Sequence, residues 1–246
     1  MEAIARAGEI LARLFAALPQ QVRPGVSTAE LDAFAEEFIR SHSGATPAFK
    51  GLYGFPASAC ISVNEEVVHG IPKARRVLAE GDLVSVDVGV QLEGWFADAA
   101  VTLPVGEIDP EARRLLDTTR AALAAGIAQA VPGRHLGDIG HAIQTTVEDA
   151  GFGIVRDLVG HGIGREPHEE PQVPNYGRPG RGVLLREGMV LAIEPMVNEG
   201  GPAVVTLPDR WTVVTADRRR SAHFEHTVAV TADGPWILTA MVDGEP

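Results

Sequence analysis

The sequence predicts an α+β fold built from two similar halves. Three features of the chain indicate it: a β-hairpin pattern over residues 83–101, apolar residues at helical spacing on both sides of that hairpin, and an internal repeat. With 246 residues, the chain is long enough for one large domain or two small ones, each with a sizeable core.

Composition and charge narrow the class of protein. Apolar residues make up 45% of the chain and charged residues 22%, which is typical of a globular protein. The net charge of −12 argues against nucleic acid or an anionic membrane as a partner, although a local basic face stays compatible with it. The single cysteine excludes an internal disulfide, and no apolar run approaches the roughly 20 residues of a membrane span. We therefore expect a cytoplasmic enzyme or binding protein.

The first 40 residues predict two helices. Apolar residues recur at helical spacing from Ile4 to Leu18, an amphipathic pattern unlike a signal peptide. Ser27 and Glu30 fit a capping box that opens the second helix. Each helix then presents one apolar face to a core.

A loop rich in glycine and aromatic residues follows at 44–56. The loop either lines an apolar pocket or packs its own hydrophobic side chains into the core. The sequence leaves both possibilities open. Residues 60–63 predict a short strand, and His69 stands before a glycine in the next loop. A lone histidine there is more often a loop residue than a functional one. The apolar members of the loop are Phe49, Leu52, Tyr53 and Phe55.

The hairpin at 83–101 carries one carboxylate in each arm. A β-branched run precedes a turn at 93–94, and Asp87 and Asp98 lie among apolar residues. Buried carboxylates are costly unless something positive pairs with them, yet no Lys or Arg occurs between Arg76 and Arg113. Their partner must therefore come from elsewhere in the chain, or it is a metal ion.

The second half predicts two more helices, at about 110–130 and 136–147, and then repeats the hairpin. Residues 80–87 align without gaps on 187–194, which places Asp87 on Glu194. The return arm at 96–102 resembles 223–228, which places Asp98 on Glu225. The extra chain at about 199–220 is expected to form another strand pair. Chance similarity of two short strands is the alternative explanation of the repeat.

If the halves pack about a pseudo-two-fold axis, four carboxylates converge and repel one another unless cations bind. His161, in a glycine-rich stretch that also holds His168, is a candidate fifth ligand, although such a stretch is more often a turn than a metal site. One histidine with four carboxylates favours Mn, Fe(II), Co or Mg over a structural zinc. Several carboxylates that can bridge indicate two ions that share a water, and such a site points to hydrolysis. His69 and His168 would then be free to contact the substrate.

These residues lie in stretches that resemble a known family. In order they are NEEVVHGIP from Asn64, the hairpin from Val86 to Asp98, GHGIGREPHEEPQV from Gly160, AIEPMVN from Ala192 and FEHTVAV from Phe224. Together they resemble the type I methionine aminopeptidases, subfamily A of peptidase family M24, over essentially the whole chain. The resemblance implies the pita-bread (creatinase/aminopeptidase) fold, a pseudo-two-fold antiparallel sheet covered by helices. It implies one catalytic domain over 1–246, with halves at about 1–105 and 106–246.

The resemblance also implies residue roles. Two divalent ions, such as Co, Mn or Fe(II), would be held by five ligands, with Asp98 and Glu225 bridging both ions. Glu194 would also move the proton of the attacking water, while His69 and His168 bind the substrate and stabilise the intermediate. The five ligands implied are Asp87, Asp98, His161, Glu194 and Glu225.

The side-chain pocket is the weaker part of the resemblance. It implies a lining at Phe49, Leu52, Phe55, Pro167 and Trp211. Leu52 stands where tyrosine is common, and Pro167 where a larger side chain is often found. Each missing large apolar group changes discrimination by about 1–3 kcal/mol, so these departures are expected to alter specificity without abolishing catalysis.

The implied reaction removes the initiator methionine from N-terminal methionyl peptides and nascent chains when the next residue is small. The free α-amino group of the substrate would bind one ion, which explains an exopeptidase. The resemblance implies a cytoplasmic monomer that acts near the ribosome, although no residue here demonstrates ribosome binding. Neither membrane association nor direct nucleic-acid binding is expected.

Three alternatives share this fold. Xaa-Pro peptidases usually carry an extra N-terminal domain, which we do not expect because the first helix begins at about residue 2. Type II methionine aminopeptidases carry an inserted helical segment after the second histidine, and residues 169–193 leave little room for one. Non-catalytic members act as binding proteins but typically lose ligands, whereas all five positions are filled here.

Overall fold

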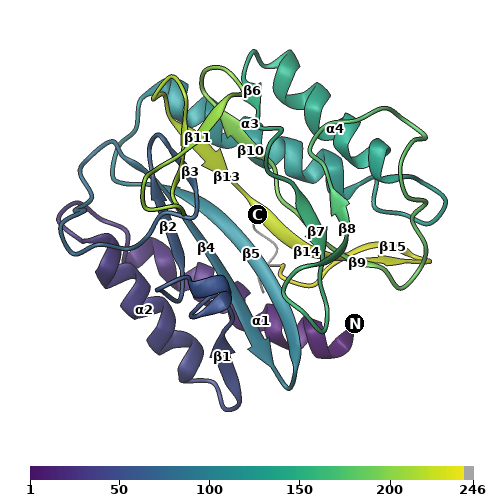
Figure 1. Cartoon of the computed structure of the whole chain (residues 1–246), viewed down its shortest axis with the longest axis horizontal. Coiled ribbons are helices and arrows are strands. Elements are labelled where there is room, and N and C mark those ends of the chain that lie inside the picture. Colours follow the sequence, from purple (N-terminus) through teal and green to yellow (C-terminus); the bar gives the residue numbers. More distant parts are fainter. Residues whose placement is uncertain (241–246) are drawn as a thin grey trace.

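The structure, a computed structural model, describes residues 1–240 and places helices around a central sheet (Figure 1). The helices are α1 (Glu2–Ala17), α2 (Thr28–Arg40), α3 (Pro110–Ile127) and α4 (Leu136–Asp149), with 3₁₀ turns η1 (Leu18–Gln20) and η2 (Leu52–Gly54). The strands are β1 (Ala45–Pro47), β2 (Cys60–Val63), β3 (Glu66–Val68), β4 (Leu83–Leu92), β5 (Trp95–Pro104), β6 (Gly153–Ile154), β7 (Gly160–Gly162), β8 (Glu169–Val173), β9 (Val190–Ile193), β10 (Met196–Asn198), β11 (Val204–Thr206), β12 (Val213–Thr215), β13 (Ser221–His223), β14 (Glu225–Thr231) and β15 (Gly234–Ile237).

The main sheet is antiparallel, which confirms the predicted fold class. Its strand order is β1-β4-β5-β14-β9-β7-β8, with β2 added to β4 and β15 added to β14. Two small sheets, β13-β10-β6 and β11-β12-β3, flank it. The hairpin β4-β5 of the first half and the antiparallel pair β14-β9 of the second half therefore lie side by side.

The predicted hairpin is confirmed and runs three residues further than expected. Its register pairs Leu83 with Pro104 at the open end and Leu92 with Trp95 at the turn. Glu93 has a φ of 51° and Gly94 a φ of 75°, the paired positive values that a tight hairpin turn requires. The pairing fixes Asp87 opposite Ala100, so both carboxylates of the hairpin lie near its middle.

Only two residue pairs join the strands at the boundary between the halves, and the side chain of Thr227 adds two hydrogen bonds there. Only Glu225–Ala100 and His226–Ala99 are paired between β14 and β5. The Oγ1 hydroxyl of Thr227 accepts from the N–H of Asp98 at 3.0 Å and donates to its carbonyl at 2.7 Å. These bonds hold the Asp98 strand against the Glu225 strand.

Two pairs of helices cover the sheet, each over its own half (Figure 1). Helix α1 packs on β4 and β5 and α2 on β1 and β2, and the core that they share includes Leu11, Leu31 and Val86. The pair α3 and α4 packs on the other half through Leu116, Ile139 and Ile193. The capping box at Ser27 is present, and no helix within residues 1–240 is long and apolar enough to cross a membrane.

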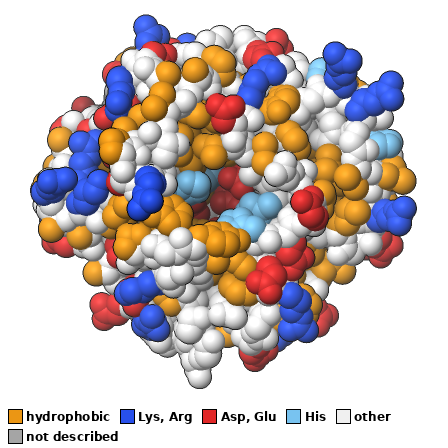
Figure 2. All heavy atoms as spheres, viewed as in Figure 1, with side chains coloured by type: hydrophobic (Ala, Val, Ile, Leu, Met, Phe, Trp, Pro, Cys, Tyr) orange, Lys and Arg blue, Asp and Glu red, His pale blue; other side chains and the backbone are white. Residues whose placement is uncertain are grey.

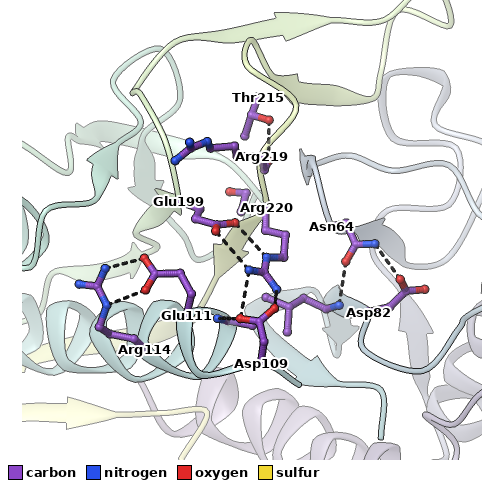
Figure 3. Close-up of polar contacts among 12 residues, drawn as sticks. Asn64, Asp82, Asp109, Glu111, Arg114, Glu199, Thr215, Arg219 and Arg220 are labelled. Atoms are coloured by element: carbon purple, nitrogen blue, oxygen red, sulfur yellow. Dashed lines mark hydrogen bonds and ion pairs between the residues drawn. The ribbon is translucent and has the colours of Figure 1, made fainter. Parts of the chain in front are cut away.

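The extra chain at 199–220 forms the expected strand pair, β11 with β12, and a charged clamp fixes its ends (Figure 3). The Arg220 guanidinium donates to Glu199 at 2.9 Å and also to Asp109, the N-cap residue of α3. Nearby, Asn64 donates to Asp82 at 2.7 Å and accepts from the N–H of Leu83 at 2.9 Å. Both contacts anchor the chain that leads into ligand-bearing strands.

Candidate metal centre and its cavity

The sheet brings the five predicted ligands together, one from each of five neighbouring strands. Asp87 lies on β4, Asp98 on β5 and Glu225 at the start of β14, while Glu194 directly follows β9 and His161 is central in β7. These strands are consecutive across the sheet in the order β4-β5-β14-β9-β7. Strands lie about 4.8 Å apart, so side chains from adjacent strands on one face converge on a small volume.

The glycines around His161 let its strand fit between two others. A Cβ at Gly160 would collide with the carbonyl of Ala192 in β9, and one at Gly162 would collide with the carbonyl of Glu170 in β8. Only glycine allows backbone to approach this closely on both sides. The glycine-rich pattern seen in the sequence therefore serves the placement of His161 in the sheet.

The ligand atoms lie at distances that a metal ion could close. Atoms from Asp98, His161 and Glu225 all lie within 4.8 Å of one another. The carboxylate of Glu194 adds an oxygen 3.5 Å from Nε2 of His161. Within residues 1–240, one carboxylate oxygen each of Asp87, Asp98 and Glu225 is buried without a hydrogen-bond partner. Orphaned buried oxygens of this kind fit a bound cation.

The electrostatics of the cluster point the same way. Burial raises the pKa of Asp98 to about 7. Burial first, and then repulsion between neighbouring carboxylates, raises the pKa of Asp87, Glu194 and Glu225 well above the usual range. No Lys or Arg of the described chain lines this cavity to offset the charge. The donor set is thus hard, acidic and unneutralised, which suits divalent cations.

Desolvation lowers the pKa of the histidines around the cluster. Burial lowers the pKa of His161 to about 4, and it also lowers the pKa of His69 and His168. The His168 ring meets the His161 ring edge-on at 4.5 Å and stacks on Tyr53 at 5.9 Å. His69 holds a left-handed backbone with φ of 58°, a conformation that non-glycine residues rarely adopt.

One cavity of about 320 Å³ contains this cluster together with an apolar wall. Figure 2 looks into its mouth, where acidic and histidine side chains lie at the bottom and hydrophobic side chains surround the opening. Eleven of the twelve predicted site residues line it: Phe49, Leu52, Phe55, His69, Asp87, Asp98, His161, His168, Glu194, Trp211 and Glu225.

The glycine-rich loop does both of the things that its sequence left open. Phe49 and Phe55 are buried and pack on Cys60, so the loop contributes to a small core. The same side chains face the cavity, where Phe55 meets Trp211 edge-on at 5.1 Å. The pocket wall is therefore also a packed cluster.

Several lining residues were missed by sequence reasoning. Val68, Leu158, Val159, Cys60 and Met196 complete the apolar wall. Met196 belongs to a stretch already singled out, and Cys60 pairs with Asp87 across β2 and β4, a register that no local pattern in the sequence reveals.

Two further placements differ from the sequence reading. Pro167 is buried and is not among the residues of 1–240 that line the cavity. Proline in place of a larger side chain at this position therefore does not change the wall directly. His223 was noticed only as part of the repeat, yet its Nε2 lies 3.6 Å from a Glu194 oxygen. A histidine two positions before a ligand was the available signal.

Comparisons with known proteins agree with this geometry. A model described as metallopeptidase family M24 matches residues 2–232. The chain is 57% identical to a methionine aminopeptidase of Clostridium perfringens, over 95% of this chain and 93% of that protein. It is 52% identical to methionine aminopeptidase 1 of Bacillus subtilis, over 95% of this chain and 93% of that protein. The crystal structure of a methionine aminopeptidase from Thermotoga maritima superposes with a TM-score of 0.95 at 48% identity, covering 97% and 96% of the two chains.

Proposed function

This chain belongs to metallopeptidase family M24, and on that premise we propose that it is a type I methionine aminopeptidase. It hydrolyses the first peptide bond of nascent proteins with two divalent metal ions and releases the initiator methionine when the second residue is small. One observation carries the proposal: five acidic and histidine side chains from five consecutive strands converge on the floor of an apolar cavity.

The metal ions are assigned to the converging side chains. Asp87, Asp98, His161, Glu194 and Glu225 would hold the two ions, with Asp98 and Glu225 shared between them. The orphaned oxygens of Asp98 and Glu225 and the short spacing between these residues and His161 support that assignment. When bound, the ions supply positive charge that polarises the peptide carbonyl and lowers the pKa of the attacking water.

Three side chains of the protein manage protons and the substrate. Glu194 accepts the proton of the attacking water and passes it to the leaving amine. His69 and His168 are assigned to the peptide: as neutral imidazoles, they donate hydrogen bonds to the substrate carbonyl as it gains negative charge. The lowered pKa of each ring supports the neutral form.

The apolar wall is assigned to the methionine side chain. Phe49, Leu52, Phe55 and Trp211 surround a space into which a flexible thioether fits, and sulfur–aromatic contacts are favourable by about 0.3–1.5 kcal/mol. Leu52 replaces the tyrosine common at this position in the family. We therefore propose a pocket that holds methionine with one polar contact fewer.

We also propose the setting in which the enzyme works. It is a cytoplasmic monomer of one catalytic domain, with halves at about 1–105 and 106–246, and it meets nascent chains at the ribosome. The one cysteine, Cys60, is a buried free thiol, which suits a reducing compartment. The similarity to a methionine aminopeptidase over 95% of this chain and 93% of that protein supports a single domain. Residues 241–246 of the second half lie outside the described residues.

A peptide assay tests the activity. Metal-stripped protein is supplied with Mn(II) or Co(II), and free methionine is measured from Met-Ala-Ser, Met-Leu-Ser and N-acetyl-Met-Ala-Ser. We expect release from Met-Ala-Ser alone, because the second residue must be small and the α-amino group must be free. Stoichiometric metal binding without methionine release would favour a binding protein on this fold.

A further inference from the structure

His223 is a buried polar side chain that the proposed mechanism does not use. It ends β13 with 1% of its surface exposed, and neither Nδ1 nor Nε2 has a hydrogen-bond partner within residues 1–240. A buried polar group without a partner costs about 1–3 kcal/mol, so an apolar side chain would serve packing better. An orphaned group in such a place calls for a functional explanation.

The ring of His223 faces the carboxylate of Glu194. Its Nε2 lies 3.6 Å from Oε2 of Glu194, and on the other side Nε2 of His161 lies 3.5 Å from Oε1. The carboxylate is thus bracketed by two imidazoles, one per oxygen. An approach closer by roughly 0.7 Å would bring the His223 pair to the usual N–H···O distance of about 2.9 Å.

The backbone of His223 is fixed, so its ring cannot easily find another partner. Its N–H donates to Oγ1 of Thr102 and its carbonyl accepts from the same hydroxyl, each at 2.8 Å. Thr102 belongs to β5, the strand of Asp98, and His223 also pairs with Met196 in β10. The same sheet that places the ligands therefore places this ring.

We propose that His223 is a positioning residue whose Nε2–H donates to Oε2 of Glu194 and fixes the rotation of that carboxylate. The inference rests on the proposed function, in which Glu194 both holds an ion and accepts the proton of the attacking water. Both tasks depend on the direction in which its two oxygens point. Groups that orient metal ligands in this way typically change metal affinity or activity 10–100-fold when they are mutated.

Two amide substitutions test the reach of the donor. In His223→Gln the side-chain N–H lies about as far from the backbone as Nε2, whereas in His223→Asn it lies only as far as Nδ1. We measure Mn(II) affinity of the metal-stripped protein by calorimetry, and kcat and KM for Met-Ala-Ser. His223→Gln is expected to stay within about threefold of wild type, and His223→Asn to lose about tenfold in affinity for one ion and in kcat, with KM unchanged.

A third variant covers the case in which His223→Asn does not fold. His223→Leu removes the donor together with the orphaned polar atoms, so it is expected to fold and to lose as much affinity and kcat as His223→Asn. The control is His226→Gln, because the His226 ring lies 2.9 Å from Thr239 and outside the cavity lining. That variant is expected to match wild type in both measurements.

The outcomes separate this inference from the proposed function. Equal behaviour of His223→Gln and His223→Asn, whether both active or both impaired, would overturn the donor assignment. An equal loss in His226→Gln would do the same, because it would report a general disturbance of β14. Wild-type protein that releases no methionine would refute the proposed function, while the Mn(II) affinities would still decide whether His223 positions Glu194.

Discussion

The floor and the wall of the cavity are built in different ways. On the floor, each proposed ligand lies on a strand or directly beside one, so backbone pairing across β4, β5, β14, β9 and β7 fixes its place. The wall draws on the loop at 44–56, which includes the turn η2, and on Trp211, and strand residues such as Cys60 and Met196 complete it. The proposed metal ligands thus lie on strands or directly beside them, whereas the large aromatic side chains of the wall lie on loops.

The largest effect is expected on the floor. Asp98→Ala should abolish activity, lowering kcat/KM by ~1,000-fold or more, about 4 kcal/mol of transition-state stabilisation, because the carboxylate proposed to be shared by both ions is lost. The fold should survive, since the Asp98 side chain lines the cavity and its buried charge is unfavourable without metal. Circular dichroism checks the fold and methionine release checks the activity. Turnover close to wild type would contradict the bridging role.

A smaller effect is expected where the floor meets the substrate. His168→Ala should lower kcat by about 100-fold, the loss typical of removing one hydrogen-bond donor to a developing oxyanion, and leave the metal content unchanged. Elemental analysis of the purified variant beside its kinetics tests this. Loss of metal would show that His168 is a ligand, and the division between floor and substrate contacts would be wrong.

A substitution in the wall should change KM and leave metal binding unchanged. Trp211→Ala removes a ring that packs on Phe55, and we expect a rise of about tenfold in KM for Met-Ala-Ser from the lost apolar contact. Metal affinity should equal that of wild type. A loss of metal affinity as large as the rise in KM would mean that wall and floor are not independent.

The smallest effect is on stability without metal. Burial raises the pKa of the floor carboxylates, so the folded protein holds protons that the unfolded chain has already released. Stability is therefore lost as pH rises through the raised pKa values. The buried histidines, whose pKa is lowered, oppose this trend only below about pH 6.5, where the unfolded chain binds their protons.

We therefore expect Tm of the metal-stripped protein to fall as the pH rises from about 6.5 through about 7, the pKa of Asp98. Mn(II) should flatten that slope, because cations pair with the carboxylates. Asp98→Asn, which keeps the shape and removes one carboxylate, is the matched control and should show a shallower slope without metal. A metal-stripped protein whose Tm rises over this range would contradict the repulsion assigned to the floor.

The same contrast explains how much the sequence predicted. The hairpin and the helices could be predicted because each depends on a local period or a cap, and the repeat of the chain pointed to the four carboxylates that line the cavity. The register that places Cys60 beside Asp87 depends on pairing between strands that lie far apart in sequence, for which no local signal exists. Met196 and Leu158 reach the wall by tertiary packing, and Pro167 fails to reach it for the same reason.

His223 shows a different limit of sequence reasoning. The residue was visible in the repeat, but a histidine two positions before a ligand has no pattern that marks it as buried and unpaired. Only the packing of β13 against β5 and β10 turns its ring toward Glu194. Positioning residues of this kind depend on the folded arrangement rather than on spacing.

The whole mechanism depends on a two-ion hydrolytic site at the floor of the cavity. The decisive experiment is calorimetric titration of the metal-stripped protein with Mn(II), run with methionine release from Met-Ala-Ser on the same preparation. We expect two ions to bind per chain and the rate to rise with their occupancy. Folded protein that binds no ion, or that releases methionine at its full rate with the metal removed, would refute the two-ion site.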